Sequence, residues 1–109
     1  MLTHKKMPQA ASVVFRKIRE ITQGPNENPA LFLSRLLETM LKYTKLDPES
    51  QEGKAYLHLH FISQSAPDIR KKLQKLEEGP QTPRRDLINL AFKVFNIREK
   101  EHKMQKEKQ

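Results

Sequence analysis

The chain of 109 residues contains no cysteine and no tryptophan, and it has only three glycines. Without cysteine there is no disulfide framework, no thiolate zinc site and no thiol nucleophile. No apolar run approaches the about 20 residues that a membrane-spanning helix requires, and the opening residues lack the hydrophobic segment of a signal peptide. These absences predict a soluble intracellular protein, or a fragment of one, with a single small core and no membrane contact.

Positive charge is in excess, with 21 Lys and Arg against 13 Asp and Glu, but it is not concentrated in one tract. The net charge of +8 divides into +4 for residues 1–20, −1 for 21–64, +3 for 65–97 and +2 for 98–109. The basic segments lack interleaved aromatic residues for base stacking. We therefore expect at most a weak, salt-sensitive attraction to RNA or to another polyanion. The candidate residues for that contact are Arg70, Lys71, Lys100, Lys103 and Lys106.

Prolines divide the chain into runs that suit helices. Four of them share one position, directly before such a run, and these are Pro29, Pro48, Pro67 and Pro83. Proline is preorganised for the first helical position, where its missing N–H would be unpaired in any case. The residues before three of them are good N-caps, namely Asn28, Asp47 and Thr82, and Ser65 can cap the helix after Pro67.

The runs between these boundaries predict an all-α domain of four or five helices. Residues 29–43 are broadly apolar, and residues 67–76 alternate apolar and basic positions at helical spacing. In residues 48–64, one face carries Ala55, Leu59 and Ile62, whereas a second apolar face has no obvious use in a monomer. A last helix begins at Pro83, and its charged continuation over residues 98–109 extends it or frays. Residues 12–21 form a further short helix or an extended lead-in.

The sequence offers little chemistry for an enzyme. His58 and His60 would face one way on a strand, as in a two-histidine metal site, but the flanking residues favour a helix, where residues two apart do not face each other. The turn at Gly24 lacks the spacing and the lysine of a phosphate loop. We expect no catalytic residues, no metal or other cofactor, and no small-molecule substrate.

One segment resembles a known motif. Residues 21–36, Ile-Thr-Gln-Gly-Pro-Asn-Glu-Asn-Pro-Ala-Leu-Phe-Leu-Ser-Arg-Leu, are similar to the major homology region of retroviral capsid proteins. The matching positions are Gln23, Gly24, Glu27, Phe32, Arg35 and Leu36. Downstream, segments such as Asp47-Pro48-Glu49 and Gln64-Ser65-Ala66-Pro67-Asp68-Ile69 resemble the capsid of gammaretroviral Gag, of the murine and feline leukaemia virus type. The resemblance covers residues 12–100.

The resemblance implies a capsid C-terminal domain, a compact bundle of four helices preceded by the turn of the homology region. It divides the chain into a flexible lead-in of residues 1–11, a domain of residues 12–97 with the homology region at 21–40, and the charged tail of residues 98–109. By resemblance, Gln23, Glu27 and Arg35 hydrogen-bond to one another and to backbone, while Phe32 and Leu36 belong to the core. A buried Arg and Glu are tolerated only when they are paired.

The resemblance also implies a dimer contact on the helix over residues 48–64. The candidate residues are Tyr56, Leu57, His60, Phe61 and Gln64. This contact would use the second apolar face, although the same side chains can instead complete the core of a monomer.

The family then implies a non-enzymatic module that joins itself and related Gag capsid proteins in a lattice, in the cytoplasm or in a virion core. A chain with no ring-forming capsid half and no zinc knuckle is expected to be an excised domain or a remnant of an endogenous retrovirus. Such a remnant would co-assemble with Gag and restrict it. The alternative is a small basic adaptor that binds RNA or an acidic partner through its termini.

Overall fold

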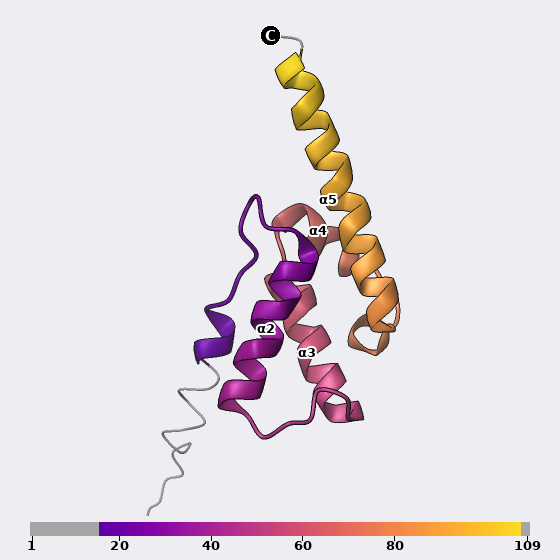
Figure 1. Ribbon diagram of the computed structural model, residues 1–109. Helices are drawn as coiled ribbons and strands as arrows, with labels where there is room; N and C mark the ends of the chain where they lie inside the picture. The colour runs from indigo at the N-terminus through magenta and orange to yellow at the C-terminus, as the bar shows by residue number, and fades with distance from the viewer. Residues whose placement is uncertain (1–15, 108–109) are drawn as a thin grey trace, which may run out of the picture.

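The computed structural model describes the backbone of residues 16–107 and the side chains of residues 16–104. Four α-helices dominate this part of the chain: α2 spans Pro29–Tyr43, α3 Gln51–Gln64, α4 Pro67–Leu73 and α5 Arg84–Glu107 (Figure 1). A short 3-10 helix, η1, covers Gly79–Gln81, and residues 16–19 form one helical turn. No residue of the described range lies in a strand, so the predicted all-α class is confirmed. Residues 1–11 of the expected lead-in lie outside it.

The core forms where the α-helices meet. α2 packs against α3, α4 packs against α5, and α5 also contacts α2. Phe32, Leu36 and Met40 point inward from α2 at steps of four, and the ring of Phe32 stacks on Phe61 of α3 with centroids 5.5 Å apart. Burying each such side chain contributes about 1.5–3 kcal/mol. The core is completed by Ile18, Leu57, Ile62, Ala66, Ile69, Leu73, Leu87 and Ala91.

Two of the four predicted helix starts are confirmed. α2 begins at Pro29, and the side chain of Asn28 accepts a hydrogen bond from the amide of Leu31 at 2.9 Å. α4 begins at Pro67, but its predicted cap is wrong. The hydroxyl of Ser65 donates to the carbonyl of Ile62 instead, so it completes the last turn of α3.

The other two helices start later than predicted. Asp47 and Ser50 form a turn in which the Ser50 hydroxyl donates to the Asp47 carbonyl and accepts from the amide of Gly53. Ser50 is therefore the cap, and α3 begins at Gln51 rather than at residue 48. α5 begins at Arg84, and Thr82 does not cap it, because the Thr82 hydroxyl is buried without a hydrogen-bond partner in the described structure.

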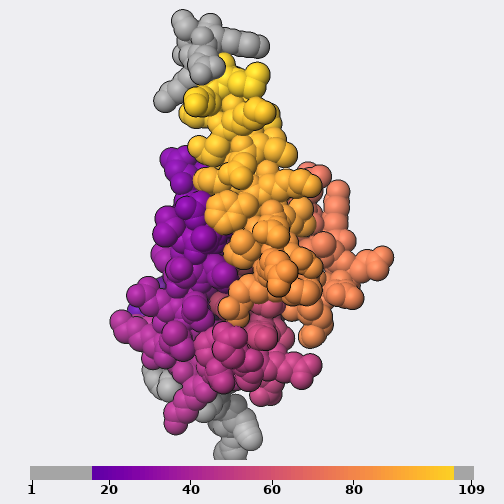
Figure 2. Space-filling model, turned by 45° about the vertical axis from the view of Figure 1, so that its right-hand side comes forward, coloured from indigo at the N-terminus to yellow at the C-terminus, as the bar shows by residue number. Residues whose placement is uncertain are grey.

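The ends of the last two helices also differ from the simple pattern. α4 stops at Leu73, so the predicted helix over residues 67–76 is too long, although Leu76 still packs against the core through the following turns. α5 continues without a break past the core to Glu107, which answers whether the charged tail extends the helix. In Figure 2 its last turns project beyond the rest of the described chain, while its first half lies against the globule.

Candidate functional site

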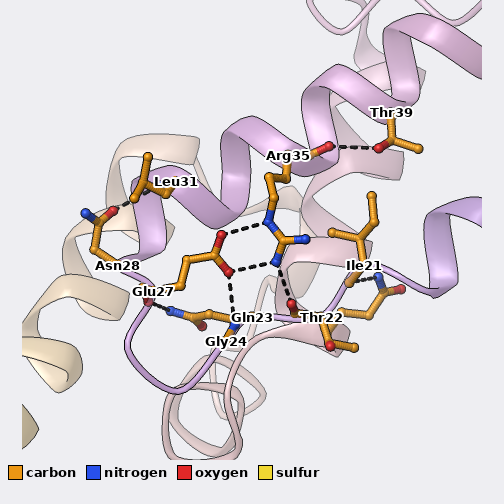
Figure 3. A network of polar contacts seen from close by, with 10 residues as sticks. Ile21, Thr22, Gln23, Gly24, Glu27, Asn28, Leu31, Arg35 and Thr39 are labelled. Carbon is orange, nitrogen blue, oxygen red and sulfur yellow. Dashed lines mark hydrogen bonds and ion pairs between the residues drawn. The ribbon is translucent and has the colours of Figure 1, made fainter.

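An ion pair links the loop before α2 to the middle of that helix. The guanidinium of Arg35 contacts Glu27 through two bonds of 2.7 Å, one from Nε to Oε2 and one from Nη2 to Oε1 (Figure 3). Nη2 also donates to the carbonyl of Thr22 at 2.7 Å, and Oε1 accepts from the amide of Gly24 at 2.9 Å. The Glu27 carboxylate thus links the backbone at the start of the turn, at Gly24, to Arg35 in the middle of α2.

The Glu27–Arg35 pair lies at the surface rather than in the interior. The Arg35 side chain is 45% exposed and that of Glu27 17% exposed, so the expectation of a buried pair is wrong for the arginine. The hydrogen bond from Arg35 lowers the pKa of Glu27 below its ordinary value, against the opposing effect of burial. The carboxylate is consequently ionised at neutral pH.

Gln23 joins the same turn to the far end of α3. Its side-chain amide donates to the carbonyl of Glu27 at 2.8 Å, and its oxygen accepts from the amide of Ala66 at 2.9 Å. Its backbone amide donates to the carbonyl of Gln64 at 3.1 Å. Because Gln23 is buried, these bonds satisfy polar groups that solvent does not reach.

A second glutamine extends this network toward the N-terminus. The amide of Gln64 donates to the carbonyls of Ile18 and Ile21 at 2.8 and 2.7 Å, and its oxygen lies 2.6 Å from Nδ1 of His60. Residues 18–21 are thereby fastened to the C-terminal end of α3. Sequence reasoning proposed Gln64 and His60 for a dimer contact and gave no signal for this internal role.

The candidate dimer residues on α3 divide between the core and the surface. Leu57 and Phe61 are 2% and 1% exposed, so these two complete the core of the monomer, the alternative that the sequence left open. His60 is also buried, at 8% exposed. Tyr56 keeps a partly exposed ring, and Leu59 is the large apolar side chain of α3 that stands in solvent, 49% exposed.

Tyr56 and Leu59 form a ridge, which we call the α3 ridge, between two grooves. A groove of about 440 Å³ on one side is lined by apolar groups that include Leu46 and Ala55. A groove of about 580 Å³ on the other side is lined by Arg19 and Arg70 together with hydroxyl and amide groups. Both grooves include the two ridge side chains in their walls.

Comparison with known proteins agrees with this architecture. A family model for the Gag P30 core shell protein matches residues 4–97. The chain belongs to this family. It is 51% identical over 85 residues to the Gag polyprotein of koala retrovirus, 48% over 85 residues to that of gibbon ape leukemia virus, and 48% over 83 residues to that of Radiation murine leukemia virus. These matches cover 76–78% of the chain but only 16% of each Gag polyprotein.

This Gag capsid relative keeps its other predicted site residues on α2. Phe32 and Leu36 are 0% and 1% exposed, and they lie in the core one and two turns from the homology-region loop. Arg35 lies on the same helix with its side chain exposed, where it meets Glu27 of the preceding loop.

The basic candidates do not form one surface. Lys71 is exposed on α4, whereas Arg70 is half buried beside the second groove. Lys100 and Lys103 are exposed on the projecting part of α5, among exposed Glu99 and Glu101. Lys106 lies in α5, but its side chain is outside the described residues.

Arg98 is a structural residue at the start of the segment that the sequence analysis treated as a charged tail. Its guanidinium lies 3.1 Å from Asp68 at the start of α4 and donates to the carbonyl of Pro25 at 2.7 Å. It also lies over the ring of Phe95. Arg98 therefore ties α5 to α4 and to the homology-region loop.

His58 and His60 lie on a helix and have separate roles. Nδ1 of His58 lies 3.1 Å from the carbonyl of Pro80, and burial lowers the pKa of this imidazole. Across residues 16–104, no group of three His, Asp or Glu side chains is placed to hold a metal ion. In the same part of the protein, no helix has the length and apolar character needed to cross a membrane.

Proposed function

We propose that the domain over residues 12–97 associates with copies of itself and with related Gag capsid proteins through the α3 ridge. Membership of the core shell family supports a structural role in Gag, and the virion core or its cytoplasmic precursor is where that role is exercised. The observation that carries the proposal is the exposed Leu59 between two grooves on one helix. Isolated apolar side chains are ordinary on surfaces, but a ridge beside hollows that the same ridge of a second copy can enter suits a symmetric contact.

A two-fold arrangement makes this surface self-complementary. If α3 of one copy crosses α3 of another in antiparallel fashion, the N-terminal half of each helix lies near the C-terminal half of its partner. Glu52 lines the apolar groove near the N-terminal end of α3, and Arg19 and Arg70 line the other groove. The contact would thus pair an acidic end with a basic end twice, while the Leu59 side chains fill the middle.

The decisive experiment is sedimentation equilibrium over a wide concentration range. We expect the wild type to form a concentration-dependent dimer and Leu59→Ser to shift the equilibrium toward monomer. Leu41→Ser is the matched control, because Leu41 on α2 is 58% exposed and Leu59 is 49% exposed, but Leu41 lines neither groove. A wild type that stays monomeric at every concentration, or equal weakening by both substitutions, contradicts the proposal.

If the chain is a remnant of an endogenous retrovirus, self-association gives it a further role as an inhibitor. A capsid domain with one competent interface, joining a growing Gag lattice, would occupy a contact without offering the next one. Expressing the chain with a gammaretroviral Gag should then reduce particle release or infectivity, and the Leu59→Ser variant should restore it. Unchanged release and infectivity would refute this role.

RNA binding through the tail is the second candidate. It is supported by the helical extension of α5, which presents Lys100 and Lys103 beyond the core. The interleaved glutamates argue that the attraction is weak, because the extension is not uniformly basic. Steep salt dependence of RNA retention that disappears on deletion of residues 99–109, which leaves Arg98 and its contacts in place, would support it. Absence of retention at low salt would exclude it.

A further inference from the structure

A cavity of about 400 Å³ lies between the first half of α3 and the turn that leads through η1 into α5. Its walls include Lys54 and His58 from α3, Thr82 from the end of η1, and Arg84 from the start of α5. Cavities that bind small molecules measure about 300–1,000 Å³, so this one is at the lower end of that range. It shares no residue with the hydrogen-bond network of the homology region.

The cavity is electropositive, and its main cation is loosely held. Arg84 lies 3.7 Å from the carboxylate of Glu49, 3.4 Å from Nε2 of His58 and 3.5 Å from the carbonyl of Pro48. All three distances are long for a charged partner, where about 2.7–2.9 Å is usual. Glu49 is the acid of the cavity wall, and its side chain is 71% exposed, so an incoming anion can displace it with little loss.

His58, in the wall of the cavity, has its protonation affected by these positive charges. With Nδ1 directed at the carbonyl of Pro80, its Nε2 is left to accept from Arg84 in the neutral form. Burial lowers the pKa of His58 most, and the positive charges of Arg84 and Lys54 lower it further. The cavity thus holds two cations beside an imidazole that stays neutral at pH 7.

Two features of the cavity violate ordinary folding preferences. Arg84 is the first residue of α5, where the helix dipole favours an anion and disfavours a cation. Thr82, which is 7% exposed and lines the cavity, has a hydroxyl without a hydrogen-bond partner in the described structure. An unpaired buried hydroxyl costs about 1–3 kcal/mol. Such local violations are expected where a site is built for a ligand.

We propose that this cavity binds a small molecule with phosphate groups, held by Lys54 and Arg84 at the N-terminal end of α5. A phosphate oxygen beside the first turn of α5 would face unpaired helix amides and reverse the unfavourable charge there. The small volume of the cavity and the exposed carboxylate of Glu49 in its wall favour a small ligand over a nucleic acid strand. The cavity shares wall residues Ala55, Pro80 and Gln81 with the apolar groove beside the α3 ridge, but it includes neither Tyr56 nor Leu59.

The test is a titration of the full chain with tripolyphosphate, followed by calorimetry and by NMR. We expect saturable binding with shifts centred on residues 54, 58 and 82–84. Lys54→Gln and Arg84→Gln should each weaken it about tenfold, equivalent to about 1.4 kcal/mol. Arg85→Gln is the matched control, because Arg85 is the next residue of α5 and carries the same charge but does not line the cavity. Helical content by circular dichroism checks that each variant is folded.

Three results would overturn the proposal. They are absence of saturable binding, equal weakening by Arg85→Gln and Arg84→Gln, and NMR shifts confined to other surfaces. A short single-stranded RNA serves as the second probe at the same salt concentration. If it binds more tightly than tripolyphosphate and depends on the same two cations, the cavity is an RNA contact and the small-ligand assignment is wrong.

Discussion

The pair of Glu27 and Arg35 permits a quantitative test of the homology-region network. Two charge-assisted hydrogen bonds of 2.7 Å join the side chains, and bonds to charged groups are worth about 1.5–3 kcal/mol each when solvent is excluded. Arg35 is 45% exposed, so water replaces part of this energy, and exposed pairs contribute only about 0.2–1 kcal/mol. Between these limits we expect Arg35→Gln to lower the free energy of unfolding by about 2 kcal/mol.

A double-mutant cycle isolates the interaction between the two side chains. Glu27→Gln keeps an oxygen to accept from the amide of Gly24, and Arg35→Gln removes the bidentate fork. We expect a coupling energy of about 1–1.5 kcal/mol from urea denaturation of the four proteins. Arg35→Lys should restore little of it, because an ammonium group cannot reproduce the fork. Lys45→Gln, at an exposed position with the same change of charge, should alter stability by less than about 0.5 kcal/mol.

The pH dependence gives an independent check. Because the folded-state pKa of Glu27 is lowered, mainly by the hydrogen bond from Arg35, its contribution is complete above the ordinary value of 4.5. It is lost as pH falls through the folded pKa, where the native carboxylate takes up a proton. The difference in stability between wild type and Glu27→Gln should therefore shrink below about pH 4.5. A coupling energy near zero, or a difference that does not change with pH, would refute the reasoning.

Three further predictions concern α3. Gly53→Ala should destabilise the protein by about 2 kcal/mol, because the new Cβ would lie 1.9 Å from the carbonyl oxygen of Asp47. This loss is expected although alanine ordinarily favours a helix over glycine. An unchanged melting temperature would contradict it. Leu57→Ala should lower the free energy of unfolding by about 3 kcal/mol and Leu59→Ala by less than about 0.5 kcal/mol, because Leu57 is buried and Leu59 is exposed. Equal losses in urea denaturation would contradict our assignment of the inward and outward faces of α3. Because the pKa of His58 is lowered, mainly by burial, the contribution of this histidine to stability is present above about pH 6.5 and is lost as pH falls toward the folded pKa. His58→Gln should therefore reduce the change of melting temperature with pH over that range. A melting temperature of the wild type that does not change with pH there would argue against this prediction.

Local chemistry explains which helix starts could be predicted. Asn28 before Pro29 combines a good cap with a preorganised first residue, and nothing nearby competes. Before α3, Ser50 competes successfully with Asp47, because its hydroxyl can donate to one end of the turn and accept from the other. Pro83 precedes α5 but its carbonyl, rather than a side chain, accepts the first helical bonds. Proline thus locates a boundary to within a turn, and side-chain competition decides the residue.

The inward face of α3 could not be predicted from its own sequence. Apolar side chains occur around most of this helix, so helical spacing alone allows more than one inward face. The choice is made by α2, whose Phe32 ring stacks on Phe61 and so turns Leu59 outward. Contacts between residues distant in the chain carry no periodic signal. The bonds from Gln64 to the carbonyls of residues 18 and 21 are of this kind.

The hydrogen-bond network of the homology region, as extended by Gln64, also shapes the surface proposed for self-association. One wall of the groove of about 580 Å³ beside the α3 ridge is formed by Arg19 and Thr22, which lie in residues 16–22, before α2, rather than in α3. This segment is held in place by Gln64, through its bonds to the carbonyls of Ile18 and Ile21. Replacing Gln64 by Glu would set a carboxylate against two carbonyl oxygens and release this wall. Self-association should then weaken together with thermal stability, whereas a change on the ridge weakens association alone. The combination of the two measurements separates a contact residue from one that shapes the groove.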